Sequence, residues 1–359
     1  MELYIHIPFC KQKCRYCDFP SYAGFLSMAD RYLEAVEKEM AYYSNHFSGE
    51  TVTSVFIGGG TPSVLTGPQL KKLLTDMQRC FHIAEDAEIT SEANPGTLKD
   101  AWLDAAAENG INRISLGMQA AQPELLRILG RIHSFDEVQQ AVTDIRRHGI
   151  RNINLDLMFG LPTQTLEQWD ETLKKAIALS PTHLSCYGLI PEENTPLKND
   201  LDCGKLRLPE DEEERLMYDH CLQLLSENGY HQYEISNFAL EGYECRHNLG
   251  YWQQIPYLGI GASSTSMLYC SDEQNLYYRQ TNPADIAGYI SMVDNKSFSQ
   301  LPREAISRKD AQFETLMLGL RTNQGISQEQ FFAMHQISLK DTCFYPQLLS
   351  LEQRQLMAC

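Results

Sequence analysis

Basic side chains are scarce in this sequence of 359 residues. The chain has 30 Lys and Arg residues against 47 Asp and Glu residues, which gives a formal net charge of −17 at pH 7. No run rich in Lys or Arg interrupts this acidic balance. A protein with this charge repels polyanions, and a phosphate backbone is bound mainly through clusters of cations. We therefore expect no nucleic-acid partner.

Long apolar runs are also lacking. The longest, such as TSVFIGGG and NINLDLMFGL, have the length of a strand and fall far short of the roughly 20 residues of a membrane-spanning helix. The first residues, MELYIHIPFC, contain an acidic side chain and lack the basic start of a signal or transit peptide. These features predict a cytoplasmic protein without a membrane-spanning segment, and they leave peripheral contact with a membrane surface open.

The cysteines do not follow the pattern of a disulfide-bonded secreted protein. Their number is odd, and eight of the 11 are scattered along the chain. The other three, Cys10, Cys14 and Cys17, lie close together in CKQKCRYC. Only these three form a pattern, so we expect the remaining eight to be reduced thiols without a special role.

Short runs rich in β-branched residues alternate with amphipathic stretches of helical length over the first 200 residues. The runs are LYIHI, TSVFIG, EITSEA, RISLGM, NINLDLMFG and HLSCYGLI, and the helical stretches cover residues 29–43, 67–80, 100–109, 134–148 and 165–178. Six such units predict an α/β fold with a parallel sheet, in the form of a partial (β/α)6 barrel of the TIM type. We expect this barrel over residues 1–200, a mixed α+β connecting region over 201–302, and a short helical C-terminal region over 303–359.

Unusual polar residues and glycines lie at or near the ends of these runs. In parallel α/β barrels the working residues lie at the carboxyl ends of the strands. IGGGTPS follows the second run, and its missing Cβ atoms let a ligand approach closely and let backbone N–H groups point outward. Glu92 and Asp156 belong to the third and fifth runs, and Gln119 directly follows the fourth. Each of these residues alone is typical of an ordinary structural residue. Because all of them lie at or near the carboxyl ends of the strands, they predict one site at this rim of the barrel.

Three thiols so close together fit two kinds of metal site. A structural zinc site uses four ligands, and His6 or a distant thiol could complete it. A cubane iron–sulfur cluster held by three thiolates keeps one iron open for another ligand. The spacing alone leaves both sites open.

The motifs together resemble those of a known family. CKQKCRYC has the CxxxCxxC spacing of the radical S-adenosylmethionine (SAM) superfamily, and GGGTPS is similar to its glycine-rich motif. The resemblance continues from Tyr4 to about Ser266 through YIHIPFC, SEANPGTL, INRISLGMQ, LGRIHS, LDLMFGLPTQT and YEISNFALEGYECRHNLGYW. In this order the motifs resemble the branch that contains oxygen-independent coproporphyrinogen III oxidase and the HemW-type haem chaperones.

This resemblance implies cofactors and the residues that hold them. Cys10, Cys14 and Cys17 would bind three irons of a [4Fe–4S] cluster, and the fourth iron would chelate the amino and carboxylate groups of SAM. Family roles place these residues around SAM: Tyr4, Tyr16, Gly59, Gly60, Thr61, Glu92, Gln119, Arg131 and Asp156. Carboxylates suit its ammonium group and ribose hydroxyls, and a guanidinium suits its carboxylate.

Three features make the chain more similar to the haem chaperones than to the oxidase. The oxidase has a further cysteine where this chain has Phe19, and it has an extension ahead of its first strand where this chain has three residues before Tyr4. RHNLGYW matches the HNxxYW motif associated with haem binding, which implies haem contacts from His247, Asn248, Tyr251 and Trp252.

Some features depart from the chaperone pattern. Those relatives continue with GAGAHS and a longer helical region, whereas this chain has GIGASSTS and a shorter C-terminal region. For His247, the alternative to a haem ligand is a hydrogen-bonded histidine in an aromatic core.

We therefore predict a haem chaperone of the HemW type that binds a [4Fe–4S] cluster, SAM and haem, and that hands haem to an acceptor such as a respiratory haem protein. The first alternative is oxidative decarboxylation of coproporphyrinogen III to protoporphyrinogen IX, which would use the same cofactor residues. The second is a structural zinc site on an otherwise inert barrel.

Overall fold

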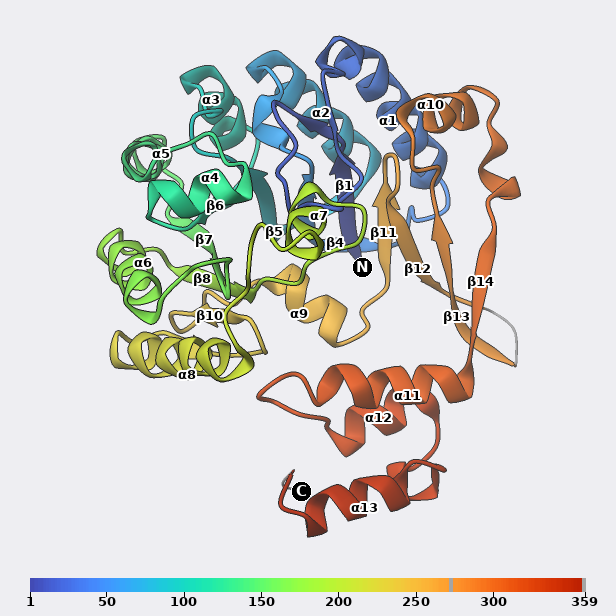
Figure 1. Cartoon of the computed structure of the whole chain (residues 1–359). Coiled ribbons are helices and arrows are strands. Elements are labelled where there is room, and N and C mark those ends of the chain that lie inside the picture. Colours follow the sequence, from blue (N-terminus) through green and yellow to red (C-terminus); the bar gives the residue numbers. More distant parts are fainter. Residues whose placement is uncertain (271–273, 357–359) are drawn as a thin grey trace.

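The fold is organised around one mixed β-sheet of twelve strands. The computed structural model describes residues 1–270 and 274–356 of the chain. The strand order is β14-β13-β12-β11-β1-β4-β5-β6-β7-β8-β10-β9, and helices pack along the outside of its curved parallel part (Figure 1). This arrangement is the partial α/β barrel that the alternation of strands and helices predicts.

The strands fall into a parallel part, an antiparallel part and a small separate pair. The parallel strands are β1 (Glu2–Ile7), β4 (Thr51–Gly59), β5 (His82–Ala93), β6 (Arg113–Gln119), β7 (Asn152–Phe159), β8 (His183–Gly188) and β11 (Tyr257–Ile260). The antiparallel strands are β9 (His231–Gln232), β10 (Asn237–Ala239), β12 (Thr265–Tyr269), β13 (Asn275–Thr281) and β14 (Arg303–Ser307). The separate pair is β2 (Phe9–Cys10) with β3 (Tyr22–Ala23).

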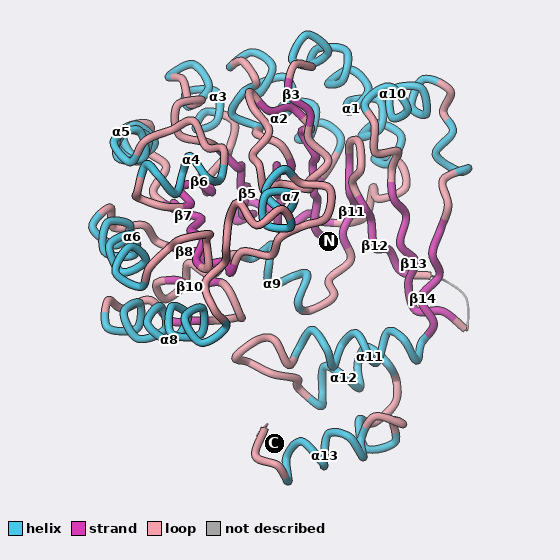
Figure 2. Tube along the Cα trace, viewed as in Figure 1, coloured by secondary structure: helices cyan, strands magenta, loops and turns pink. Residues whose placement is uncertain are grey.

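The helices form an outer layer and a C-terminal group (Figure 2). The helices between the parallel strands are α1 (Ala29–Ser44), α2 (Gly67–Cys80), α3 (Asp100–Glu108), α4 (Pro123–Leu129), α5 (Phe135–Arg147) and α6 (Leu166–Ala178). The later helices are α7 (Pro196–Asp202), α8 (Asp211–Glu227), α9 (Arg246–Trp252), α10 (Ile286–Asp294), α11 (Arg308–Gly319), α12 (Gln328–His335) and α13 (Tyr345–Gln353). Across the described parts of the chain, no helix is both long enough and apolar enough to cross a membrane.

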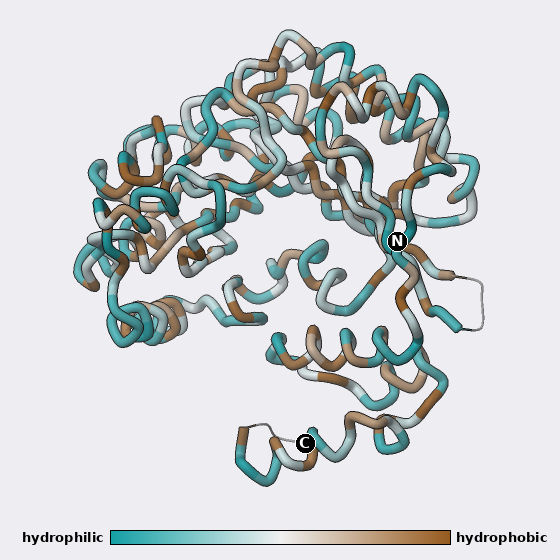
Figure 3. Tube along the Cα trace, turned by 45° about the vertical axis from the view of Figure 1, so that its right-hand side comes forward, coloured by the Kyte–Doolittle hydropathy of each residue, from teal (hydrophilic) through white to brown (hydrophobic). Residues whose placement is uncertain are grey.

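Alternation of side chains along the strands separates an apolar core from a polar barrel interior. On β1, Leu3, Ile5 and Ile7 are fully buried and belong to the main hydrophobic core. Each such burial stabilises the fold by roughly 1.5–3 kcal/mol. The alternate residues Glu2, Tyr4 and His6 point to the opposite face, because successive side chains of a strand alternate. Figure 3 shows the corresponding mixture of hydrophobic and hydrophilic residues along the chain.

Capping boxes begin three of the helices that the sequence predicts. In each, the residue before the helix accepts a hydrogen bond from a backbone N–H three residues later, and that later side chain accepts one in return. The pairs are Thr66 with Gln69 at α2, Ser134 with Glu137 at α5, and Thr165 with Gln168 at α6. These local signals explain why the predicted helix boundaries agree closely with the structure.

Several elements were not anticipated, and three of them extend or interrupt the predicted pattern. The short strand β11 extends the parallel sheet beside β1, although its four residues lie in a region whose pattern is irregular. The helix α4 begins after a gap of three residues from the end of β6. The strand β14 occupies residues 303–307, where we expected the helical region to begin, and that region begins at Arg308. The twelve-stranded sheet contains strands from all three of the regions expected from the sequence.

Candidate active site at the carboxyl ends of the strands

A cavity of about 360 Å³ opens at the carboxyl ends of the parallel strands. Its wall contains Cys10, Cys14 and Cys17, which lie on β2 and the loop that follows it. It also contains all but one of the residues predicted around SAM: Tyr16, Gly59, Gly60, Thr61, Glu92, Gln119, Arg131 and Asp156. The structure therefore brings together in one cavity residues from five strands and three loops of the barrel.

Each of the three thiols has a hydrogen-bond donor beside it, and for Cys17 the donor is the backbone N–H of Phe19. Cys10 is 7% exposed, and the Thr61 hydroxyl donates to its Sγ at 3.5 Å. Arg131 Nη1 donates to the Sγ of Cys14 at the same distance. The thiolate is the form that binds iron, and burial raises the pKa of Cys17. This donor set fits an iron–sulfur cluster with one open iron position.

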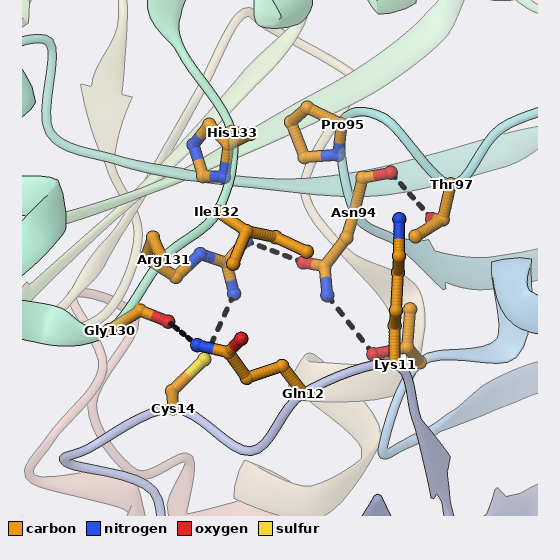
Figure 4. Close-up of a pocket in the computed structure, with 11 residues that line it drawn as sticks. Lys11, Gln12, Cys14, Asn94, Pro95, Thr97, Gly130, Arg131, Ile132 and His133 are labelled. Atoms are coloured by element: carbon orange, nitrogen blue, oxygen red, sulfur yellow. Dashed lines mark hydrogen bonds between the residues drawn. The ribbon is translucent and has the colours of Figure 1, made fainter. Parts of the chain in front are cut away.

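The guanidinium of Arg131 is fixed beside the cysteines (Figure 4). Its Nη2 donates to Asn94 Oδ1 at 2.6 Å and to the Gly117 carbonyl at 2.7 Å. Its Nε is buried and has no hydrogen-bond partner within residues 1–270 and 274–356. A buried donor without a partner is costly, so this N–H fits an anionic ligand group such as the SAM carboxylate.

Glu92 on β5 and Asp156 on β7 bring two carboxyl groups to the same cavity. Glu92 accepts a hydrogen bond from the Gly59 N–H at 3.0 Å, and burial, reinforced by Asp156, raises its pKa to about 7. Asp156 accepts hydrogen bonds from Ser115 and Asn154, and burial raises its pKa as well. Both groups lack the solvation that favours a charged carboxylate, and a cationic or hydroxyl-bearing ligand would supply it.

The glycine-rich turn differs from our expectation. The Gly59 N–H donates to Glu92, and the next two N–H groups donate to carbonyls of the β1–β2 segment at 2.9 and 2.8 Å. The expectation that these groups point outward is therefore wrong. Packing requires the missing side chain instead, since a Cβ on Gly60 would lie 2.7 Å from the Phe9 carbonyl oxygen. The turn contributes the shape of the wall through its close contact with β1 and β2.

A second cavity, of about 280 Å³, adjoins the first. Its wall contains the aromatic side chains of Tyr4, Phe19, Tyr251 and Tyr257, and we refer to it as the aromatic cavity. Three residues line both cavities: Phe19, Gly59 and Glu92. Tyr4, which the resemblance assigns to SAM, therefore lies in the aromatic cavity beside the residues that the two cavities share.

The histidine of the HNxxYW motif is enclosed in the protein interior. His247 on α9 is 1% exposed, with Nδ1 2.8 Å from Ser54 Oγ and Nε2 3.1 Å from the Tyr251 hydroxyl. Its ring stacks on Phe56, and burial lowers its pKa to about 3. Neither ring nitrogen is free in this arrangement. These surroundings agree with a hydrogen-bonded core histidine. Ligation of haem iron by His247 stays a prediction, and it requires α9 to move because both ring nitrogens are engaged.

The other residues of this motif face different surroundings. Tyr251 lines the aromatic cavity, whereas Trp252 lines a third cavity of about 690 Å³ beside α11 and α12. Asn248 is half-buried and lines neither of these two cavities. The motif therefore does not present its four residues on a single binding face.

The geometry of His6 weighs against a structural zinc site. Its Nδ1 lies 3.0 Å from the Tyr4 hydroxyl and its Nε2 lies 2.8 Å from the Pro20 carbonyl, so neither nitrogen is available to complete a cysteine set. Outside residues 271–273 and 357–359, no three His, Cys, Asp or Glu side chains are grouped as around one metal ion.

Sequence reasoning missed several residues of the first cavity: Ser21, Ser115, Tyr187, Leu189 and Ile190. The hydroxyl of Ser21 is buried and has no partner in the part of the chain that the structure describes. The last three residues lie within the sixth run, HLSCYGLI. Its carboxyl end is at the same edge of the barrel as the carboxyl ends of the other five runs. That shared position is the signal that could have identified them.

Comparisons with known proteins agree with this geometry. Residues 4–176 match the family model of the radical SAM superfamily. The chain is 37% identical to the haem chaperone HemW of Bacillus subtilis over 99% of this chain and 92% of that protein, and 39% identical to that of Synechocystis over 93% and 81%. Among solved structures, the chain is similar to coproporphyrinogen III oxidase (HemN) of Escherichia coli, a radical SAM enzyme, with a TM-score of 0.83. The two sequences are 25% identical, and the match covers 99% of this chain and 82% of the HemN chain.

Proposed function

Because the chain belongs to the HemW family of the radical SAM superfamily, we propose that it is a haem chaperone, which binds haem and transfers it to acceptor haem proteins in the cytoplasm. One observation carries the proposal: the similarity to proteins of this name extends over nearly the whole chain. Phe19 supports it, because a 64% exposed aromatic ring stands where the oxidase has a further cysteine. Respiratory haem proteins are the acceptors we propose.

The first cavity would hold the cofactors of the superfamily. Cys10, Cys14 and Cys17 would bind three irons of a [4Fe–4S] cluster, leaving one iron for the amino and carboxylate groups of SAM. The unpaired Nε of Arg131 would donate to the carboxylate, and Glu92 would accept from the ammonium group. When bound and reduced, the cluster supplies the electron that cleaves SAM in this superfamily. The protein residues orient the ligand and exclude water from it.

Haem would bind on the side of the HNxxYW motif. The aromatic walls suit a flat apolar ring, and Tyr251 and Trp252 line two separate cavities. The predicted haem contacts of His247, Asn248, Tyr251 and Trp252 remain part of the proposal. His247 would support its neighbours from within the core, since its nitrogens are already engaged.

The structural similarity to HemN favours one second candidate function, the oxidative decarboxylation of coproporphyrinogen III. Both functions would use the same cysteines and the same SAM residues. They differ in what happens next: the decarboxylase uses a radical on its substrate, whereas the chaperone releases haem unchanged.

One experiment separates these functions. The cluster-loaded protein is incubated anaerobically with a reductant, SAM and coproporphyrinogen III, and protoporphyrinogen and 5′-deoxyadenosine are measured; haem is titrated into a second sample. The chaperone proposal predicts stoichiometric haem binding without protoporphyrinogen. Multiple turnovers to protoporphyrinogen would replace it with the decarboxylase. Zinc without iron or sulfide in anaerobically purified protein would contradict both.

A further inference from the structure

The third cavity is larger than the two cavities near the cysteines. Its volume is about 690 Å³, compared with about 360 Å³ for the first cavity and about 280 Å³ for the aromatic cavity. Cofactor sites have volumes of roughly 300–1,000 Å³. The third cavity lies between α9 and the pair α11–α12, which Figure 1 shows below the barrel. No described residue lines both this cavity and either of the others, so a ligand here leaves the predicted SAM site free.

The helix α9 has two faces with different surroundings. His247 and Tyr251 lie four residues apart on the side of the barrel, where His247 stacks on Phe56 of β4 and Tyr251 lines the aromatic cavity. Leu249 and Trp252 lie three residues apart and line the third cavity. Residues at these spacings share one face of a helix. One face of α9 therefore anchors the helix to the barrel, and the other face presents the Trp252 ring to the third cavity.

The opposite wall of the third cavity is a packed part of the fold. Thr315 on α11 donates a hydrogen bond to Oε1 of Gln254, in the turn after α9. The loop between α11 and α12 is held against the barrel, because the Asn323 N–H donates to the Tyr233 carbonyl at 3.0 Å. Phe331 on α12 is 1% exposed and contributes to the cavity wall. Both walls therefore exist before any ligand binds.

The wall of the third cavity is uncharged. The chain has 47 Asp and Glu residues, yet none of the described residues that line this cavity is charged. Aromatic and aliphatic side chains alternate there with the amides of Gln253, Gln324 and Gln330. Haem combines a flat apolar ring with two carboxylates. A wall without carboxylates does not repel these groups, and amide N–H groups can donate hydrogen bonds to them.

Met334 is the wall residue best placed to ligate haem iron. The side chains that ligate haem iron are those of His, Cys, Met and Tyr, and among the described wall residues these are Met334 and Tyr269. Tyr269 is 57% exposed, whereas Met334 is half-buried. The Thr315 hydroxyl lies 3.7 Å from the Met334 Sδ, but its single proton bonds to the nearer Gln254, so the sulfur keeps its lone pairs. The adjacent His335 does not line the cavity, and its Nε2 lies 2.9 Å from the Thr315 hydroxyl.

We propose that haem binds in the third cavity, with its ring beside Trp252 and its iron ligated by the Sδ of Met334. The proposal rests on the haem-binding function proposed above. On binding, the thioether donates a lone pair to the iron and displaces a water ligand, and neither a proton nor an electron is transferred. A thioether is a known ligand of haem iron. A single ligand from this protein leaves the second axial position of the iron to an acceptor protein.

The location of the site is tested by filling the cavity. Ala333 is an exposed residue of α12 that lines the cavity, so Ala333→Trp adds a large side chain there without a change in the core. Gln328→Trp is the control, because Gln328 is exposed on the same helix and lies outside the cavity wall. Haem is titrated into each full-length, cluster-loaded protein with and without SAM. We expect binding to be weaker by about tenfold or more in Ala333→Trp, and unchanged in the control and by SAM.

The iron ligand is tested by removing the sulfur. Met334→Leu keeps the size of the side chain, and Met317→Leu, at a 37% exposed position of α11, is the control. Near-infrared magnetic circular dichroism difference spectra between haem-loaded and haem-free protein report the charge-transfer band of thioether-ligated ferric haem. We expect this band in the wild type, in Met317→Leu and in Tyr269→Phe, and its loss in Met334→Leu.

The outcomes distinguish the site from the function. Wild-type haem affinity of a folded Ala333→Trp would overturn the location, and an unchanged band in Met334→Leu, or its loss in Tyr269→Phe, would overturn the ligand. Circular dichroism and iron content show whether each variant folds, and the conservative Met334→Leu keeps the proposal testable if Ala333→Trp does not. All of these results leave the chaperone function in place, whereas a wild-type protein that binds no haem would refute the proposed function itself.

Discussion

Replacing Glu92 by glutamine should stabilise the ligand-free protein and at the same time weaken its binding of SAM. The carboxyl group is buried, and its pKa of about 7 lies above the ordinary value of 4.5. A group whose pKa is raised by folding stabilises the protein fully below its unfolded pKa, and this contribution is lost as the pH rises through the folded pKa. The wild type therefore loses stability from Glu92 between about pH 4.5 and pH 7.

The size of this effect follows from the difference between the two pKa values, which corresponds to about 3 kcal/mol at most. In Glu92→Gln the amide oxygen can still accept the Gly59 N–H, but no buried charge forms. The variant should thus be more stable than the wild type at pH 8, by up to about 3 kcal/mol in the free energy of unfolding, and nearly equal to it at pH 5. Urea unfolding of the apo protein at both values measures this.

The expected effect of Glu92→Gln on SAM binding is opposite to its effect on stability. A hydrogen bond to a charged group contributes roughly 1.5–3 kcal/mol, so Glu92→Gln should bind SAM roughly 10- to 150-fold more weakly at pH 8. Wild-type affinity should fall as the pH falls below about 7, because the carboxylate becomes protonated. Calorimetry under anaerobic conditions measures both, with Glu85→Gln on the exposed part of β5 as the control. Equal SAM affinity of Glu92→Gln and wild type at pH 8 would refute the assigned contact.

Three further outcomes are expected. Gly59→Ala should destabilise the fold by about 2–4 kcal/mol in urea unfolding, because its φ is +111° and the new Cβ would lie 2.3 Å from the His6 ring. Gly49→Ala, a control with open space around the new Cβ, should have little effect on the free energy of unfolding. Equal effects of the two substitutions would contradict the packing argument. His247→Ala should destabilise the fold by about 2–4 kcal/mol, since it leaves a cavity and removes the hydrogen-bond partner of the Tyr251 hydroxyl. A variant of wild-type stability would show that the ring is not a core group. Cys17→Ser should lower iron and sulfide content after anaerobic reconstitution, whereas serine at any of the eight scattered cysteines should not.

Much of the fold follows from local patterns in the sequence. Six strand-length runs with helices between them predict a parallel barrel, and the capping pairs at Thr66, Ser134 and Thr165 define helix starts that the structure reproduces. The strand β11 was missed because YLGI has only four residues and its partner β1 is more than 250 residues away. Pairing over such a distance leaves no periodic signal near the strand itself.

The candidate site was predictable to a similar extent. Residues at strand ends meet at one rim in any parallel barrel, so the grouping of Cys10, Glu92 and Asp156 follows from topology. The environment of His247 did not follow, because a motif letter does not say which face of a helix is buried. Its ring packs on Phe56 and bonds to Ser54, and both belong to β4, almost 200 residues earlier.

The most direct test of the chaperone function is haem transfer. The cluster-loaded protein is charged with one equivalent of haem, separated from free haem, and mixed with an apo form of a respiratory haem protein, whose reconstituted absorption spectrum is followed with time. We predict stoichiometric loading and transfer that restores the acceptor, with the donor recovered haem-free and its porphyrin unmodified in the acceptor. Failure to retain haem through the separation, or retention without any transfer to acceptors that take up free haem, would contradict the account.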